Sequence, residues 1–188
     1  MRGRPEQVRA RMKLERWGDW AADYAGATVV EPFSDVANFV ITDSAHVAES
    51  WDTGYSPEFG EAAKLGLLGD DANIDELSRR GVAIVVRTGS DGAWSVPVRV
   101  HRARPKQLPE GAKWLLCPLT VESGRVLVHC ACYVIEAGEE HSVGVPRGRY
   151  SVRVCRLDYD AADAPTFVVD LWPATEQDEA EYRWEWLD

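Results

Sequence analysis

Apolar and polar residues alternate strictly along one stretch in the middle of the chain. From Trp94 to Val100 every second side chain is apolar, so a strand there turns its apolar side chains to one face. The preceding run, 82–86, is continuously apolar and mostly β-branched, which is typical of a strand buried on both faces. The turn-like residues 88–92 separate the two runs. We therefore expect a hairpin, with Pro97 placing its second strand at an edge or a bulge.

Further short β-branched or aromatic runs, separated by glycine-containing turns, fill most of the chain beyond residue 26. They predict strands at 28–32, 39–42, 114–121, 126–136, 150–157 and 166–172, and allow a closing strand at 182–187. Parallel sheets need helical crossovers at most connections, and these runs leave little room for them. The predicted fold is mostly β, an antiparallel β-sandwich.

Two stretches carry helical spacing instead. Pro5 can open a short basic helix over 5–17, whose single weak apolar stripe favours a packing appendage over a surface for a membrane or an acidic partner. Helical or irregular structure is also expected as an insertion at about 55–80, where 56–65 and 73–77 fit helical turns. The 188 residues thus divide into a basic helical appendage at 1–25, a β-sandwich domain at 26–174 and an acidic, Trp-rich tail at 175–188.

The charge of the chain is strongly acidic and unevenly distributed. There are 31 acidic and 21 basic residues, a net charge of -10. This argues against nucleic acid as the main ligand and suits a basic partner. Residues 1–20 hold six bases and three acids, 43–76 hold nine acids and one base, and 79–113 hold eight bases and two acids. Such polarity between segments can produce opposed faces.

The sequence predicts a cytoplasmic protein. No window approaches 18 consecutive apolar residues, and no apolar stretch follows the N-terminal bases, so neither a spanning helix nor a secretory signal is expected. The four cysteines are then reduced thiols, and disulfides are not expected. A membrane partner is not predicted either.

His129-Cys130-Ala131-Cys132 is the sequence most suggestive of chemistry. On a strand, Cys130 and Cys132 share one face and His129 takes the other, so the three cannot bind one metal unless the strand breaks. The two cysteines continue an apolar face, and we expect them in the core. The alternative is a four-thiolate site completed by Cys117 and Cys155, although structural zinc usually uses CxxC spacing.

Catalytic arrangements have equally little support. No known nucleophile signature surrounds a cysteine, although four histidines could serve as a base: His46, His101, His129 and His141. Asp43, Ser44 and His46 imitate a triad, but local turn hydrogen bonding by the first two is favoured. The acids at 70–76 lack the calcium-loop pattern, and phosphate-binding glycine motifs are absent. We predict no enzyme, no metal and no cofactor.

The tail presents aromatic residues at alternate positions. Tyr182, Trp184 and Trp186 fall on one face of an extended segment, with Arg183 and Glu185 on the other. This spacing favours a closing strand that packs its aromatics on the body. The alternative is an aromatic and acidic strip for a protein interface.

Several of these stretches together resemble a known family. The Pro-x-Gly turn at 146–148 with Tyr150 opening the next strand, the run 166–172, and the stretches 39–43, 51–52, 81–87 and 94–100 are similar to the competence protein J family of bacterial nuclease inhibitors and to related immunity-type β-sandwich proteins. The resemblance covers about residues 37–172. It implies a small, acidic, cytoplasmic β-sandwich that binds and silences a nuclease.

The leading hypothesis is therefore a non-enzymatic inhibitor or immunity protein for a basic nuclease or toxin. A nuclease site is basic because it holds phosphates, and clustered carboxylates compete for it. The partner-binding residues predicted in the acidic segment are Trp51, Asp52, Tyr55, Glu58, Asp70 and Asp71. One alternative is a small-molecule or carbohydrate site lined by Trp51, Trp94 or Trp172. The other is a metal-dependent hydrolase using His129 and acidic residues.

Overall fold

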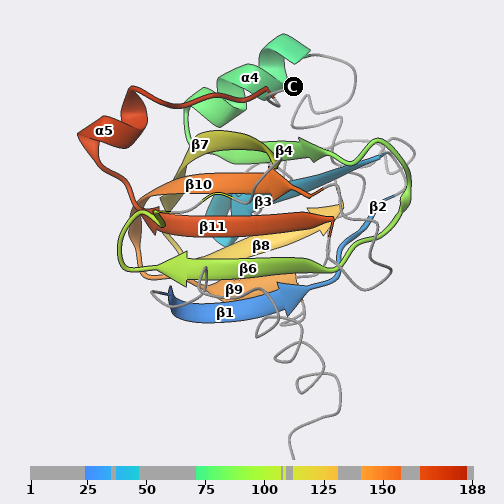
Figure 1. Ribbon diagram of the computed structural model, residues 1–188, viewed down its shortest axis with the longest axis horizontal. Helices are drawn as coiled ribbons and strands as arrows, with labels where there is room; N and C mark the ends of the chain where they lie inside the picture. Colours follow the sequence, from blue (N-terminus) through green and yellow to red (C-terminus); the bar gives the residue numbers. More distant parts are fainter. Residues whose placement is uncertain are drawn as a thin grey trace, which may run out of the picture.

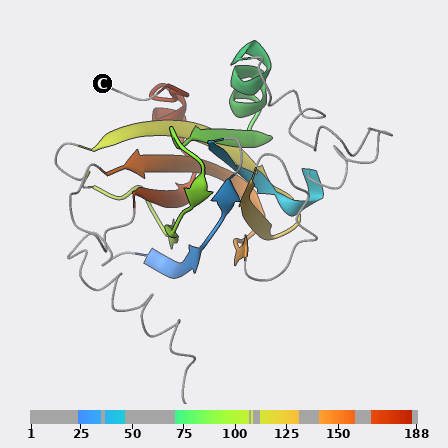
Figure 2. The same cartoon turned by 90° about the vertical axis from the view of Figure 1, so that its right-hand side faces the viewer.

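The computed structural model describes residues 24–34, 37–46, 71–106, 108, 112–130, 141–157 and 166–185, most of which lie in strands (Figures 1 and 2). The strands are β1 (Tyr24–Val30), β2 (Phe33–Ser34), β3 (Asn38–Asp43), β4 (Ala83–Arg87), β5 (Gly92–Ala93), β6 (Val96–His101), β7 (Lys113–Val121), β8 (Arg125–Cys130), β9 (Ser142–Gly144), β10 (Gly148–Arg156) and β11 (Phe167–Pro173). The helices are α4 (Asp71–Arg79) and α5 (Glu176–Glu179).

Two sheets pack face to face, which confirms the predicted mostly β fold. One sheet has five strands in the order β1-β6-β11-β10-β7, and the other has four in the order β4-β3-β8-β9. The short strands β2 and β5 pair separately. One core joins the two sheets, and Phe39 of β3 meets Phe167 of β11 edge to face with 5.4 Å between ring centroids. Alternation along each strand supplies this core, since every second side chain faces inward.

The predicted hairpin around 88–92 is wrong. β4 pairs with β3 in the four-stranded sheet, whereas β6 lies between β1 and β11 in the five-stranded sheet. The connection crosses from one sheet to the other, and residues 92–93 within it form β5, which pairs with β2. The alternation of apolar residues fixed the inward faces correctly. It carries no information on which strand becomes the neighbour.

Pro97 also occupies a different place from the predicted edge or bulge. It pairs with Val29 of β1 inside the sheet, and the parallel pairing of β6 with β11 begins only at Val98. Proline cannot donate to a ladder, and a position near the start of a strand removes that conflict. The parallel β6–β11 pair is an exception to the predicted antiparallel arrangement, since the other strand pairs described are antiparallel.

The remaining expectations divide into confirmed elements and elements outside the described residues. Strands appear at β3, β7, β10 and β11 as predicted, β1 begins and ends earlier than 28–32, and β8 is described to Cys130. The second insertion helix is confirmed as α4. The predicted helices at 5–17 and 56–65 lie outside the described residues. None of the helices described is long and apolar enough to cross a membrane.

Residues 182–185, the described part of the closing strand predicted at 182–187, do not form a strand. The chain before them forms α5, whose N-cap Thr175 and Asp178 make a reciprocal capping box, and Arg183 then makes a single bridge with Leu116 of β7. The predicted packing of aromatics on the body holds for Trp184, which contacts the core. The capping residues start a helix just before the alternating aromatic residues, so the chain there does not continue in the extended conformation that the alternation predicted.

Strand β7 forms one edge of the five-stranded sheet, and the chain itself occupies most of that edge. The outward N–H of Leu116 donates to Arg183 O at 2.9 Å, and that of Thr120 donates to Gly81 O at 2.9 Å. Pro118 stands between them on the same side and has no N–H to offer. An edge strand with unpaired backbone groups can pair with a strand of another chain, so these hydrogen bonds protect β7 from such pairing.

Candidate functional site

The partner-binding residues predicted from the sequence fall largely outside the described part of the chain. Trp51, Asp52, Tyr55, Glu58 and Asp70 lie in the segment 47–70, which is outside it. Asp71 is the first residue of α4, and its side chain is not among those described. Helix α4 thus contains the C-terminal end of the acidic segment 43–76, and residues 43–46 are the other described part of that segment.

The outward face of the five-stranded sheet holds a buried ionic group that the sequence did not predict, which we call the Asp170 cluster. It consists of Arg99 and His101 from β6, Arg153 from β10 and Asp170 from β11. Asp170 lies between two register partners, Arg99 on one side and Arg153 on the other. Successive side chains of a strand face opposite sides of the sheet. Because the neighbours of these four residues face the core, the four side chains lie together on the opposite face.

Every oxygen of the Asp170 carboxylate has a donor. Oδ1 accepts from Arg99 Nε at 2.6 Å and from His101 Nε2 at 2.7 Å, and Oδ2 accepts from Arg153 Nη2 at 2.9 Å. Asp170 is 0% exposed and Arg99 2%. Burial alone would raise the pKa of Asp170, but the His101 hydrogen bond and the charges of Arg99 and Arg153 outweigh it and hold the pKa well below its ordinary value. A carboxylate held ionised by three donors is a poor proton acceptor, so this cluster is suited to bracing three strands.

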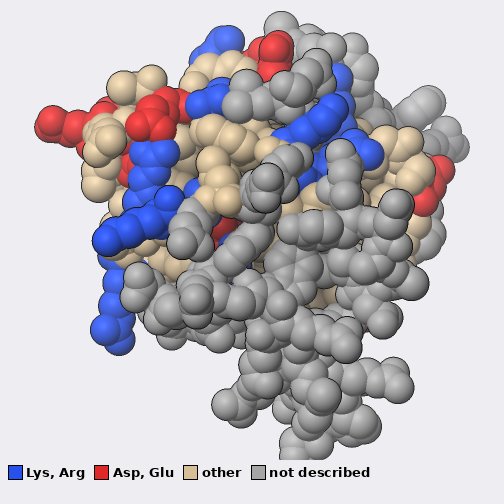
Figure 3. Space-filling model, in the orientation of Figure 1, with Lys and Arg blue, Asp and Glu red and all other residues tan. Residues whose placement is uncertain are grey.

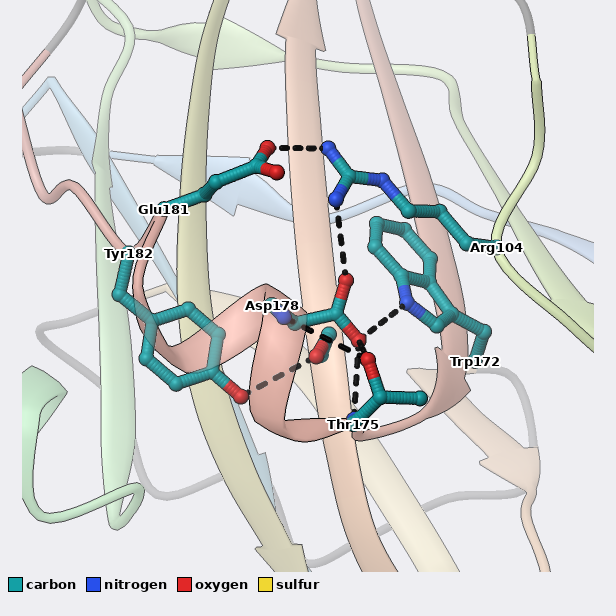
Figure 4. Close-up of polar contacts among 7 residues, drawn as sticks. Arg104, Trp172, Thr175, Asp178, Glu181 and Tyr182 are labelled. Atoms are coloured by element: carbon teal, nitrogen blue, oxygen red, sulfur yellow. Dashed lines mark hydrogen bonds and ion pairs between the residues drawn. The ribbon is translucent and has the colours of Figure 1, made fainter.

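A second polar group, the Asp178 cluster, joins α5 to the sheet (Figure 4). The carboxylate of Asp178 accepts from Trp172 Nε1 at 3.0 Å, from Thr175 Oγ1 at 2.8 Å and from Arg104 Nη1 at 3.3 Å. Arg104 also pairs with Glu181. Burial would raise the pKa of Asp178, yet the hydrogen bonds from Thr175 and Trp172 lower it overall. The side chain is 0% exposed, so the four-residue helix is fixed from its buried face.

Helices α4 and α5 lie over the same side of the sandwich, where they form an acidic edge (Figures 1 and 2). We define this edge by its acidic side chains on the two helices, which are Asp75, Glu76, Glu176 and Glu179. Figure 3 shows acidic side chains gathered over α5 and a further group over α4. Glu179 pairs with Arg149 at 3.2 Å and Asp75 with Arg79 at 3.9 Å. Solvent weakens ion pairs between exposed side chains, so these two pairs do not cancel the negative charge of the acidic edge.

The histidine and cysteine arrangements considered from the sequence do not assemble. Asp43 is buried, and its carboxylate accepts from the backbone N–H groups of Ala45, Glu122 and Ser123, which confirms turn hydrogen bonding in place of a triad. Cys117 faces the inter-sheet core and Cys155 faces outward, so the four-thiolate site is wrong. Within the described ranges, no group of three or more His, Cys, Asp or Glu could hold a metal. The side chains of Cys130 and Cys132 lie outside those ranges.

The two described tryptophans of the alternative ligand site do not share a pocket. Trp94 packs against Phe167 on the core side, with 5.4 Å between ring centroids. Trp172 is buried on the outward face of the sheet and donates to Asp178. Trp51 lies outside the described residues. The structure therefore gives no support to an aromatic concavity built from Trp94 and Trp172.

The fold and its two buried clusters define a small two-sheet β-sandwich with a C-terminal segment docked on one sheet. No protein-family model and no curated protein matches the chain. Two solved structures share the fold. One is described as crocagin biosynthetic gene J, with 20% identity and a TM-score of 0.50 over 80% of this chain and 99% of that chain. The other is ComJ of Bacillus subtilis, described as an inhibitor of the DNA-degrading activity of NucA, with 12% identity and a TM-score of 0.51 over 78% of this chain and 96% of that chain. The resemblance to competence protein J is thus confirmed at the level of the fold.

Proposed function

We propose that this chain is a non-enzymatic inhibitor that binds a basic nuclease and blocks its active site. The observation that carries the proposal is the fold shared with ComJ, an inhibitor of the NucA nuclease, over most of both chains. Fold alone does not determine function, so the charge of the chain provides the second support. A net charge of -10 favours encounter with a basic surface, and clustered carboxylates can compete with DNA phosphates for that surface.

The proposed contact surface is the acidic segment 43–76. Trp51 and Tyr55 would act as aromatic anchors, and Asp52, Glu58, Asp70 and Asp71 would supply charge. Within this segment the structure describes residues 43–46 and, in helix α4, residues 71–76, where Glu76 is exposed. Charged rim residues chiefly affect association rate and its salt dependence, whereas buried anchors set dissociation.

Inhibition assays with purified protein test the proposal. The chain is titrated into NucA and into other DNA-degrading nucleases of basic net charge, and DNA degradation is measured. We expect activity to vanish at an equimolar ratio for a cognate nuclease, and inhibition to weaken between about 50 mM and about 500 mM salt as charges are screened. Inhibition of none of them, or inhibition that salt leaves unchanged, would contradict the proposal.

A pair of charge-matched variants separates a specific surface from bulk charge. One variant combines Asp52→Asn, Glu58→Gln, Asp70→Asn and Asp71→Asn. The control combines Glu31→Gln, Glu122→Gln, Glu176→Gln and Glu185→Gln, all at exposed positions. Both remove four negative charges. We expect the half-inhibiting concentration to rise about tenfold or more in the first variant and much less in the control.

A further inference from the structure

The C-terminal residues 174–185, which we call the strap, cross the outer side of the five-stranded sheet and reach α4 (Figure 1). The order of its contacts follows the order of the strands, from β11 through β10 to the edge strand β7. Its successive contacts are Asp178 with Trp172 of β11, Tyr182 with Ser151 of β10, Arg183 with Leu116 of β7, and Trp184 with Arg79 of α4.

The strap is anchored at its beginning by Asp178. The Asp178 carboxylate meets Trp172 Nε1, Thr175 N, Thr175 Oγ1 and Arg104, so it joins the helix to β11 and to the loop after β6. The helix itself has only four residues and cannot be stable on its own. The buried, ionised carboxylate of Asp178, with its full set of hydrogen-bond donors, therefore holds this end of the strap.

The far end of the strap contacts the edge of the sheet and then α4. Arg183 N donates to Leu116 O at 2.7 Å and Arg183 O accepts from Leu116 N at 2.9 Å, while the Arg183 guanidinium lies 3.6 Å from the centroid of the Trp114 ring. The next residue, Trp184, packs on the core and lies under Arg79, with 5.1 Å from the guanidinium carbon to the ring centroid. Arg79 is the last residue of α4, so the strap contacts the C-terminal end of that helix.

We propose that the strap positions α4 for the partner, and that Asp178 is the positioning residue at its anchor. This inference rests on the proposed function, because α4 ends the segment assigned to the nuclease. Asp178 itself is 0% exposed and would not touch the partner. Releasing it loosens the Arg183 bridge, then the contact of Trp184 with Arg79, and thereby α4.

Hydrogen exchange of the isolated chain, measured residue by residue by NMR, tests whether the strap holds α4 in place. Asp178→Asn places an amide against the Trp172 and Thr175 donors, whereas the control Glu176→Gln removes the same charge from an exposed position in the same helix. We expect exchange at Arg183, Leu116 and the α4 amides to rise about tenfold in Asp178→Asn and to stay at the original rate in Glu176→Gln. Equal behaviour of the two variants, or loss of protection at Arg183 with α4 unchanged, overturns the proposal.

A second set of variants decides the question if Asp178→Asn does not fold. Arg79→Gln removes the cation over Trp184 and leaves the anchor intact, and it also removes the exposed pair with Asp75. Arg80→Gln is the exposed, charge-matched control, and Asp75→Asn removes the Asp75 pair while it keeps the cation. A single cation–π contact predicts about threefold faster exchange in α4 for Arg79→Gln alone. Equal α4 exchange in Arg79→Gln and Arg80→Gln, or in Arg79→Gln and Asp75→Asn, overturns the proposal.

Inhibition of a nuclease that the unmodified chain inhibits supplies the functional readout. We expect the half-inhibiting concentration to rise about tenfold for Asp178→Asn and about threefold for Arg79→Gln, and to stay unchanged for Glu176→Gln and Arg80→Gln. Faster α4 exchange with unchanged inhibition overturns the positioning role. Failure of the unmodified chain to inhibit any nuclease overturns the proposed function instead, and the exchange data then still decide whether the strap holds α4.

Discussion

Arg99 and Asp170 lie directly opposite each other on the neighbouring parallel strands β6 and β11, and their side chains meet on the outward face with 2.6 Å between Nε and Oδ1. Arg153 reaches the other oxygen of the same carboxylate from β10. One buried acid thus joins three adjacent strands. Its two arginine partners make the pairing tolerable in the interior, because each buried charge has an opposite charge in contact.

Removing the shared carboxylate is expected to destabilise the fold strongly. Asp170→Asn leaves Arg99 and Arg153 buried without their counter-charge, and breaking a buried pair from one side costs about 3–5 kcal/mol. The free energy of unfolding in urea measures the loss. Glu31→Gln, at an exposed position, is the control and should change stability by less than about 0.5 kcal/mol. An Asp170→Asn midpoint equal to that of the control would show that the cluster does not brace the sheet.

The same carboxylate predicts how stability depends on pH. Its pKa in the folded chain lies well below the ordinary value of about 4, so on acidification the unfolded chain takes up the proton first. Its contribution is therefore fully present above that ordinary value and is lost as the pH falls through the lower folded pKa. Unfolding measured from neutral pH downward should show a constant difference between the original chain and Asp170→Asn, which shrinks below about pH 4. A difference that grows on acidification would contradict this assignment.

The sequence pattern predicted which side chains face the core far better than it predicted which strands pair. The alternation of β6 placed Val96, Val98 and Val100 inward correctly. The predicted neighbour of β6 was wrong. The connection from β4 crosses from one sheet to the other, and a local turn pattern does not reveal such a crossing. Partners distant in sequence, such as β11 for β6, are chosen by the packing of the whole sandwich.

The buried clusters were missed because alternation assigns polar positions of a strand to solvent. Arg99 and His101 belong to the polar set of β6, yet both are 2% exposed. One signal was available in the sequence, since Asp170 is the lone acid within the apolar run 167–172. A charge in such a run needs a buried partner, and Arg153 in the preceding apolar strand was a candidate. The structure does not test the predicted interface residues in this way, because most of them lie outside the described residues.

The thiols of Cys117 and Cys155 are expected to be unreactive in the folded protein. Burial raises the pKa of each to about 12, and Asp75 adds to the effect at Cys117. At pH 8 about one thiol in ten thousand is then ionised, and the thiolate is the reactive form. Alkylation of the native chain at pH 8 followed by peptide mapping should leave both unmodified, whereas both react in denaturant. Rapid native labelling of either would show that it is accessible.

The bridge between Arg183 and β7 predicts a difference between two substitutions at one position. Arg183→Pro removes the N–H that donates to Leu116 O, whereas Arg183→Ala keeps it and loses only the contact with Trp114. We expect Arg183→Pro to destabilise the chain by about 1–3 kcal/mol more than Arg183→Ala, since it leaves a buried carbonyl without its donor.

Exposure of this edge should also change the oligomeric state. With Leu116 released, β7 offers an unpaired stretch before Pro118, and an open edge pairs with other chains. Light scattering after size exclusion should show concentration-dependent association for Arg183→Pro and the same mass as the original chain for Arg183→Ala. Association of both variants would assign the effect to the Trp114 contact, and association of neither would show that Pro118 and the Thr120–Gly81 hydrogen bond protect the edge without the strap.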